Sequence, residues 1–354
     1  MSKIQNIQGL RGIAVLFVLM VHIGLVEKKY SAYPILPEFV QFGMSGVDIF
    51  FVISGFIMMT LSMHRTKNVN NAISFLYSRV VRVYPIYWFY SGVVLLVLLV
   101  HPSWVNSSSS GEIDLLKSFL LFPQSVAPLL QVGWTLIHEM YFYIGFFLLL
   151  LFFRSNSALF LVSMLWAISV IFLESMFSFT DPVMQIVTHP LTLEFFGGII
   201  IAYVGLKIDL KCSTMLLKNL FLLLLLLLIF NYILFDNIYA TDPFRWWRVV
   251  LFGLPAMALL FVSIQLEKKG YTFPLWLVVI GDRSYTVYLS HLLVINVVGR
   301  IWQYFSFEGF WASVMFLLVL VISTLLYGKY AYEWIEVPML EKLRALLRVK
   351  KRSI

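Results

Sequence analysis

Long apolar segments recur along the chain at intervals that suit a protein crossing a membrane many times. Segments of about twenty residues with few charges lie at approximately 9–27, 44–62, 83–100, 133–153, 158–175, 190–206, 219–235, 247–266, 274–298 and 311–331. Since a helix rises about 1.5 Å per residue, about twenty apolar residues cross a hydrocarbon core of about 30 Å. The pattern therefore predicts an all-α integral membrane protein, a bundle of about ten transmembrane helices.

Basic residues in the connections predict how this bundle is oriented. Lys and Arg are more frequent in the even-numbered loops and both terminal segments than on the opposite side. Such an excess is typical of cytoplasmic segments, so we expect cytoplasmic N- and C-termini. We divide the chain into a membrane domain at 1–335 and a short basic cytoplasmic tail at 336–354. Apolar residues at helical spacing predict a short interfacial helix near 113–120, in the longest outer loop.

The composition agrees with a membrane protein and restricts the classes of partner that we expect it to bind. The chain is 61% hydrophobic and 12% charged, with a mean hydropathy of +0.89, which excludes an ordinary soluble domain. Its net charge of +8 resides in loops and tail, so we expect contact with anionic membrane lipids and no nucleic acid. One cysteine excludes an intrachain disulfide, and no His/Cys cluster has zinc spacing. We expect no metal site.

The first apolar segment carries two ionisable residues, Arg11 and His22. They are eleven positions apart, almost three helical turns, so they share a helix face and lie about 16 Å apart along the axis. Ionisable groups at membrane depth are costly, and each is a functional hypothesis by default. The alternative is that Arg11 reaches lipid headgroups and His22 is a hydrogen-bonded packing residue.

Other expected spans bring ionisable groups to the outer half of the membrane together with His22. They are Asp48, Glu139 and His291, and buried groups of this kind pair with one another or line a wet cavity. Histidine, with an unperturbed pKa of about 6.5, suits general base chemistry, and a carboxylate from Glu139 or Asp48 would orient it. Two alternatives remain. Asp48 makes an interhelical hydrogen bond, or His291 belongs to a structural polar stripe with Ser284 and Tyr288.

A second group of cations is expected on the cytoplasmic side. Arg79 and Arg82 are three residues apart and therefore lie on one helix face, shortly before Pro85. With Arg11 they form a candidate anion site, because arginine forks suit phosphate groups. The alternative is an ordinary basic flank of a membrane span. The spacing of about 16 Å between Arg11 and His22 is comparable to an extended pantetheine arm, so an acyl-coenzyme A would place phosphates at arginines and its thioester near a base.

At these residues the chain resembles the bacterial membrane acyltransferase 3 family, and within it the exopolysaccharide or O-antigen acetyltransferase branch. The resemblance is carried by motifs spread over nearly the whole chain, namely LRGIAVLFVLMVHIG, FGMSGVDIFFVISGFIM, SRVVRVYP, WTLIHEMYFY, GDRSYTVYLSH and YEWIEVPM. It implies a ten-helix, acyl-CoA-dependent enzyme of the bacterial inner membrane. It further implies that His22 is the catalytic base and that Arg11, Arg79 and Arg82 serve the donor. Glu336, in the terminal motif, is expected to mark a helix end at the inner surface.

The resulting hypothesis is an O-acyltransferase that moves an acyl group, by family default acetyl, from cytoplasmic acetyl-CoA to a hydroxyl of a surface polysaccharide or its lipid-linked precursor. No cofactor is expected to be bound permanently, since acyl-CoA is a substrate. Within the quoted motifs we expect contacts to substrate from Trp134, Ser284, Tyr288 and His291. The main alternative is a proton-coupled transporter or flippase of an envelope glycan or acyl precursor, because the same ionisable groups would serve a proton relay. A polysaccharide polymerase or ligase is a third reading.

Overall fold

The computed structural model describes residues 4–64, 68–105, 112–241, 246–305 and 307–352, and it is helical, without a strand, in these ranges. Nine helical segments of the described chain are long and apolar enough to cross a membrane. They are Gln5–Tyr30, Glu38–Met63, Val69–Val100, Gly133–Phe152, Asn156–Met176, Pro182–Lys207, Thr214–Phe235, Trp246–Lys268 and Phe310–Leu343. The prediction of an all-α, multi-pass membrane protein is confirmed.

The expected span at 274–298 is two helices rather than one. Helix α12 (Leu275–Asp282) starts directly after Pro274, and a single residue separates its end from the start of α13 (Ser284–Gln303). Arg283 lies between them and its backbone N–H closes the last turn of α12. Proline starts a helix readily, and charged residues at the break interrupt the apolar run. As a result α13 falls outside the set of strongly apolar spans.

The chain folds into two compact units that alternate along the sequence. The first unit comprises Met1–Leu25, Leu36–Ala72 and Gly145–Ser284, and the second comprises Val26–Ile35, Ile73–Ile144 and Tyr285–Ile354. The tail expected at 336–354 is helical as far as Arg352, as α15 (Val337–Arg352). We describe each unit by itself.

The first unit contains α1 (Gln5–Tyr30) as far as Leu25 and most of the central part of the chain. Its other elements are η1 (Glu38–Met44), α2 (Ser45–Met63), α6 (Asn156–Met176), α7 (Pro182–Val187), α8 (Thr192–Tyr203), η3 (Gly205–Lys207), α9 (Thr214–Thr241), α10 (Trp246–Arg248), η4 (Val249–Gly253), α11 (Leu254–Lys268) and α12.

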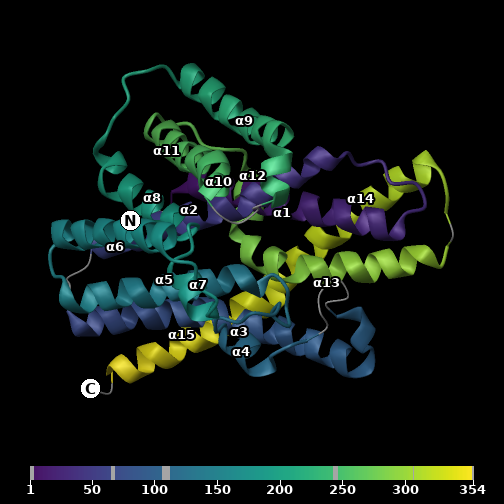
Figure 1. Cartoon of the computed structure of the whole chain (residues 1–354), viewed down its shortest axis with the longest axis horizontal. Coiled ribbons are helices and arrows are strands. Elements are labelled where there is room, and N and C mark those ends of the chain that lie inside the picture. Colours follow the sequence, from purple (N-terminus) through teal and green to yellow (C-terminus); the bar gives the residue numbers. More distant parts are fainter. Residues whose placement is uncertain (1–3, 65–67, 106–111, 242–245, 306, 353–354) are drawn as a thin grey trace. The chain divides into compact units, whose positions relative to one another are not determined.

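Glycine lets α2 and α8, which lie side by side in Figure 1, approach closely. A Cβ on Gly55 would stand 1.9 Å from the carbonyl oxygen of Phe195, and one on Gly198 would stand 2.0 Å from that of Val52. Small residues at helix crossings permit such backbone contact, which supplies packing where lipid offers no hydrophobic drive. The α2–α8 pair is therefore the centre of the first unit.

We expect Gly198→Ala to destabilise the protein by about 1–3 kcal/mol, because the new methyl group overpacks the α2–α8 crossing. The measurement is thermal unfolding of the purified protein in detergent. The matched control is Gly92→Ala, since a Cβ at Gly92 meets nothing within 4 Å. Equal unfolding temperatures for the two variants would contradict this account of the crossing.

The connection from α1 to α2 runs back along α1 instead of staying at its outer end. Val40 of η1 lies against Gly24, and Gly43 approaches the carbonyl of Phe17. Gly46, in the first turn of α2, approaches the carbonyl of Ala14. The first turn of α2 thus lies level with Ala14, ten residues further down α1 than Gly24. It is therefore deeper than in a helix that entered beside the end of α1.

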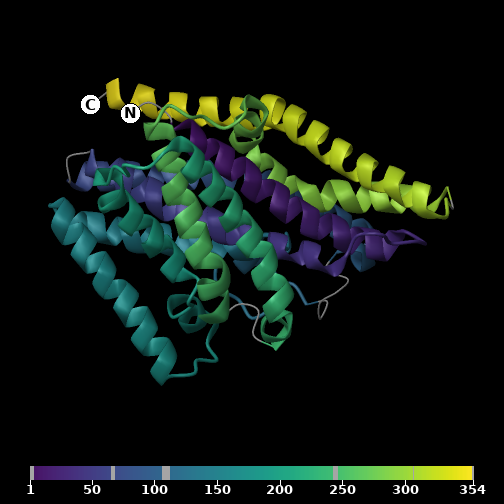
Figure 2. The ribbon, with the colours of Figure 1, turned by 90° about the horizontal axis from the view of Figure 1, so that it is seen from above.

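The second unit contains α3 (Val69–Val100) from Ile73 onward and α5 (Gly133–Phe152) as far as Ile144. Its other elements are η2 (Pro102–Trp104), α4 (Leu115–Leu120), α13 from Tyr285, α14 (Phe310–Ala331), η5 (Tyr332–Glu336) and α15. Figure 2 shows α14 and α15 as one long helical run in yellow. The π-helical segment η5 joins them and shifts the residues that face inward.

The short helix expected near 113–120 forms as α4 (Leu115–Leu120), and side chains of α3 hold its end. Three side chains of α3 donate hydrogen bonds to its last three carbonyl groups, namely Tyr87 to Ser118 at 2.6 Å, Trp88 to Phe119 at 2.8 Å and Tyr84 to Leu120 at 2.8 Å. Trp88 lies twelve residues, or about 18 Å, before the end of α3 at Val100. Aromatic donors therefore hold α4 beside the middle of α3, and its place at a membrane interface stays a prediction.

Removing one of these donors has a defined expected cost. Tyr87→Phe removes one of the two hydrogen bonds to the buried carbonyl of Ser118, which keeps the backbone N–H of Leu121 as a donor. We therefore expect a loss of about 0.5–1.5 kcal/mol of stability. Thermal unfolding measures the loss, and protease sensitivity of the 112–132 segment reports whether it is local. Tyr77→Phe on the same helix is the control. If both variants match the parent protein in both assays, the hydrogen bond contributes nothing.

Candidate functional site

His22 is held by its own helix in a single ring orientation. Its Nδ1 lies 2.8 Å from the carbonyl oxygen of Val18, one turn earlier. A carbonyl oxygen only accepts, so Nδ1 carries the proton and Nε2 carries the lone pair. This is the tautomer that a general base working through Nε2 requires.

Arg11 lies on the same unbroken helix as His22, as predicted. Its side chain is half-buried, and Nη1 donates to Oε1 of Gln8 at 3.1 Å. The guanidinium is thereby held close to the start of α1, about three turns from the histidine. Both residues belong to the first unit, where the depth difference between cation and base follows from the helix itself.

Asp48 does not share the depth of His22, contrary to expectation. Because Gly46 lies against Ala14, the first turn of α2 is level with a residue eight positions before His22, about 12 Å along the axis. The prediction of equal depth assumes that the second span begins at the outer end of the first, and the return of η1 along α1 removes that assumption. A catalytic role for Asp48 stays a prediction, and the structure gives it another partner.

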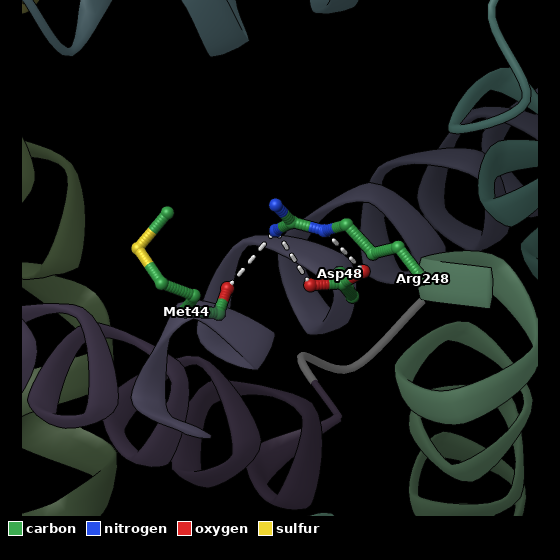
Figure 3. Close-up of polar contacts among 3 residues, drawn as sticks. All are labelled: Met44, Asp48 and Arg248. Carbon is green, nitrogen blue, oxygen red and sulfur yellow. Dashed lines mark hydrogen bonds and ion pairs between the residues drawn. The ribbon is translucent and has the colours of Figure 1, made fainter. Parts of the chain in front are cut away.

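That partner is Arg248, which the sequence analysis did not single out. Figure 3 shows its guanidinium between Asp48 and Met44. Nε donates to Oδ1 of Asp48 at 3.0 Å, and Nη2 donates to Oδ2 at 2.8 Å and to the carbonyl of Met44 at 3.1 Å. Both side chains are fully buried. The position of Arg248 at the start of an apolar segment could have marked it as a candidate residue, since a charged side chain in a membrane span is rare.

In the second unit, Arg79, Arg82 and Glu139 come together around Tyr143. The hydroxyl of Tyr143 donates to Glu139, one turn earlier on α5. The Arg79 guanidinium lies 5.9 Å from the centre of the Tyr143 ring, and Arg82 lies equally far from the ring of Tyr285. Glu139 and Arg82 also act electrostatically on Arg79. The paired arginines thus face aromatic rings and a carboxylate inside the unit, which an ordinary basic flank does not require.

Glu336 joins this group rather than ending a helix at the surface. Its side chain is buried, and Thr286 donates a hydrogen bond to it. Glu336, Glu139 and Arg82 all act electrostatically on Tyr285. The π-helical turn that ends at Glu336 directs it inward, and the sequence carries no signal for such a turn. The group therefore contains two positive side chains and two acidic side chains.

The four residues expected to contact substrate have separate surroundings. In the second unit, the Tyr288 hydroxyl lies 2.7 Å from that of Thr135, and Nδ1 of His291 lies 2.7 Å from the carbonyl of Tyr288. Trp134 packs edge-on against His138. Ser284 is buried at the end of the first unit. The hydrogen bonds of Tyr288 and His291 favour the structural stripe that was the alternative, and a substrate contact stays a prediction.

Comparison with known proteins places the chain in one family. The acyltransferase domain family matches residues 4–328. The exopolysaccharide production protein ExoZ of Rhizobium meliloti (strain 1021) is 31% identical over 317 residues, which cover 86% of this chain and 91% of that protein. No solved structure matches. Among the residues that the structure describes, no group of three or more His, Cys, Asp or Glu side chains is arranged to hold a metal ion.

Proposed function

Because the chain belongs to the acyltransferase domain family and its apolar helices make it a membrane acyltransferase, we propose that it transfers an acetyl or other short acyl group from cytoplasmic acyl-CoA. The proposed acceptor is a hydroxyl of an exopolysaccharide or its lipid-linked precursor. The bacterial inner membrane is the proposed location. The observation that carries the proposal is the contact of 2.8 Å between Nδ1 of His22 and the carbonyl oxygen of Val18, on a membrane helix that also holds Arg11.

His22 has the geometry of a general base. Nε2 takes the proton of the acceptor hydroxyl while the oxygen attacks the thioester carbonyl, and the C–S bond breaks as the ester forms. The imidazolium returns the proton to the departing thiolate, so the reaction balances without another proton donor. The carbonyl of Val18 accepts from Nδ1 throughout, which leaves Nε2 as the atom that takes up the proton.

Arg79 and Arg82 are the proposed phosphate-binding groups of the donor site, and Arg11 is a further cation for the donor. Guanidinium groups bind phosphate through paired N–H donors. The ring of Tyr143 lies close to the guanidinium of Arg79, and the ring of Tyr285 lies close to that of Arg82. Glu139 accepts a hydrogen bond from the hydroxyl of Tyr143. We propose that Glu139 acts as a positioning residue for the arginine pair rather than as the partner of the histidine.

Reversing charge at the pair tests this assignment. We expect Arg82→Glu to weaken acyl-CoA binding by at least about tenfold, since a hydrogen bond to a charged group contributes about 1.5–3 kcal/mol. Binding of labelled acetyl-CoA to protein in nanodiscs is the readout. Arg154→Glu is the control, because Arg154 is an exposed cation in the other unit. Unchanged donor binding by Arg82→Glu in folded protein would remove Arg82 from the donor site.

The acceptor is proposed from the relative, whose name states exopolysaccharide production. The decisive experiment incubates the nanodisc protein with labelled acetyl-CoA and extracted envelope glycan. Coenzyme A release that depends on added glycan, with label on the glycan, supports the acyltransferase. Folded protein that binds donor but releases no coenzyme A with glycan present, while moving a labelled glycan or acyl precursor across the membrane, would overturn the proposal in favour of the transporter reading.

A further inference from the structure

Three ionisable side chains meet in the interior of the first unit. Asp48 comes from the first turn of α2, Glu194 from the first turn of α8 and Arg248 from the end of α10. The exposed fractions are 0% for Asp48, 0% for Glu194 and 1% for Arg248. Taking a charge out of water costs several kcal/mol, so a cluster this deeply buried has to be close to neutral.

The charges of this cluster do not balance if both acids are ionised. Arg248 supplies one positive charge, and its Nε and Nη2 pair with the two oxygens of Asp48. The carboxyl group of Glu194 lies within hydrogen-bonding reach of Asp48, yet no N–H or O–H donor among the described residues reaches either of its oxygens. Two carboxyl groups in contact are both acceptors unless a proton lies between them.

The backbone around Glu194 leaves room for its carboxyl group at this place. A Cβ on Gly253 would stand 3.0 Å from Oε1 of Glu194, so glycine is what fits there. Gly253 ends the π-helical segment η4, which begins directly after Arg248. Asn231 of α9 donates to the carbonyl of Leu251 within that segment at 2.6 Å. The irregular turn is therefore supported by hydrogen bonding, and π-bulges frequently occur at functional sites.

We propose that Glu194 and Asp48 form a proton-binding site, in which Glu194 keeps its proton at neutral pH and donates it to the carboxylate of Asp48. The cluster then carries one positive and one negative charge. The bound proton joins α8 to α2, because no donor among the described residues reaches the oxygens of Glu194. The acyl transfer proposed above consumes and releases no net proton, so this site is distinct from that chemistry and stands or falls without it.

The surroundings contain few groups that would replace this proton. The charged groups acting on Glu194 are Asp48 of α2 and Arg248 of α10. From α6 and α11, the side chains nearest the neighbouring positions of α8 are Trp166, packed on Phe196, and Met257, close to Gly197. Neither is titratable, so the proton balance of the cluster rests on the two carboxyl groups.

Infrared spectroscopy of the full-length protein in nanodiscs tests the proposal directly. At neutral pH we expect the carbonyl band of a protonated carboxylic acid, which is separate from the bands of carboxylates, and we expect Glu194→Gln to lose it. Glu308→Gln, at an exposed site of the second unit, should keep the band. A band of the same intensity in Glu194→Gln, or its absence from the parent protein, would overturn the proposal.

Proton release on unfolding provides an independent readout if the band is difficult to assign. A native state that binds one more proton than the unfolded state loses stability as the pH rises, because its unfolding equilibrium constant increases about tenfold per pH unit. Between pH 6 and 8 the parent protein should therefore show a steeper fall of melting temperature than Glu194→Gln. The amide of Gln donates to Asp48 without titrating, so the variant should fold. Parallel curves for the two proteins would contradict a retained proton.

Discussion

Arg248→Met should destabilise the protein by about 3–5 kcal/mol, the usual cost of removing one partner of a buried ion pair. The substitution leaves Asp48 with no cation on its two oxygens and the carbonyl of Met44 without its donor. Methionine fills most of the volume, so the loss reflects uncompensated charge rather than a cavity. We expect poor membrane yield and a much lower unfolding temperature in detergent. Acyl transfer should fall only in proportion to the folded fraction.

A compensating change separates charge from packing. Asp48→Asn in the Arg248→Met background removes the stranded carboxylate, so the double variant should recover much of the lost stability. Arg154→Met, at an exposed position, controls for loss of an arginine as such. If the double variant were no more stable than Arg248→Met, the charge argument would be wrong and the role of Arg248 would be one of shape.

His22→Ala should lower the turnover of acetyl-CoA and glycan by about 10²–10⁴-fold, the usual contribution of a general base. Donor binding should be unchanged, because His22 is not among the cations proposed to bind the donor. The comparison is made on folded protein, with the unfolding temperature measured for each variant. The readout is label transferred to glycan at saturating donor. His64→Ala, beyond the end of α2, is the matched control. A His22→Ala protein with full transfer at normal abundance would exclude His22 as the base.

Apolar periodicity was sufficient for the helical class and most spans, because burial of backbone polar groups in lipid leaves few alternatives. It did not predict breaks within apolar runs. The segment 274–298 divides at Arg283, and the connection at 38–44 returns along α1. The second depends on Gly43 and Gly46 meeting the backbone of α1, which is a property of two helices together and is invisible in either segment alone.

Candidate residues were predictable where the local sequence marked them. Their roles were less predictable where these depend on a contact with a residue distant in sequence. Arg79, Arg82 and Glu139 were named from sequence, but Tyr143, which lies one turn from Glu139 and close to Arg79, was not among the candidate residues. Asp48 was named without Arg248, which is 200 residues away in the sequence. Glu336 was misplaced because a π-helical turn rotates it inward.

The attachment of α4 to α3 has a consequence for biosynthesis. A six-residue helix is far too short to be recognised as a membrane-crossing segment during insertion. Its last three carbonyl groups accept hydrogen bonds from side chains of α3, and carbonyls that lose such donors are unfavourable in lipid. The segment therefore takes its place after α3 is already in the bilayer, as a late step of maturation. Variants that weaken the attachment should accumulate as inserted but incompletely matured protein rather than fail to insert.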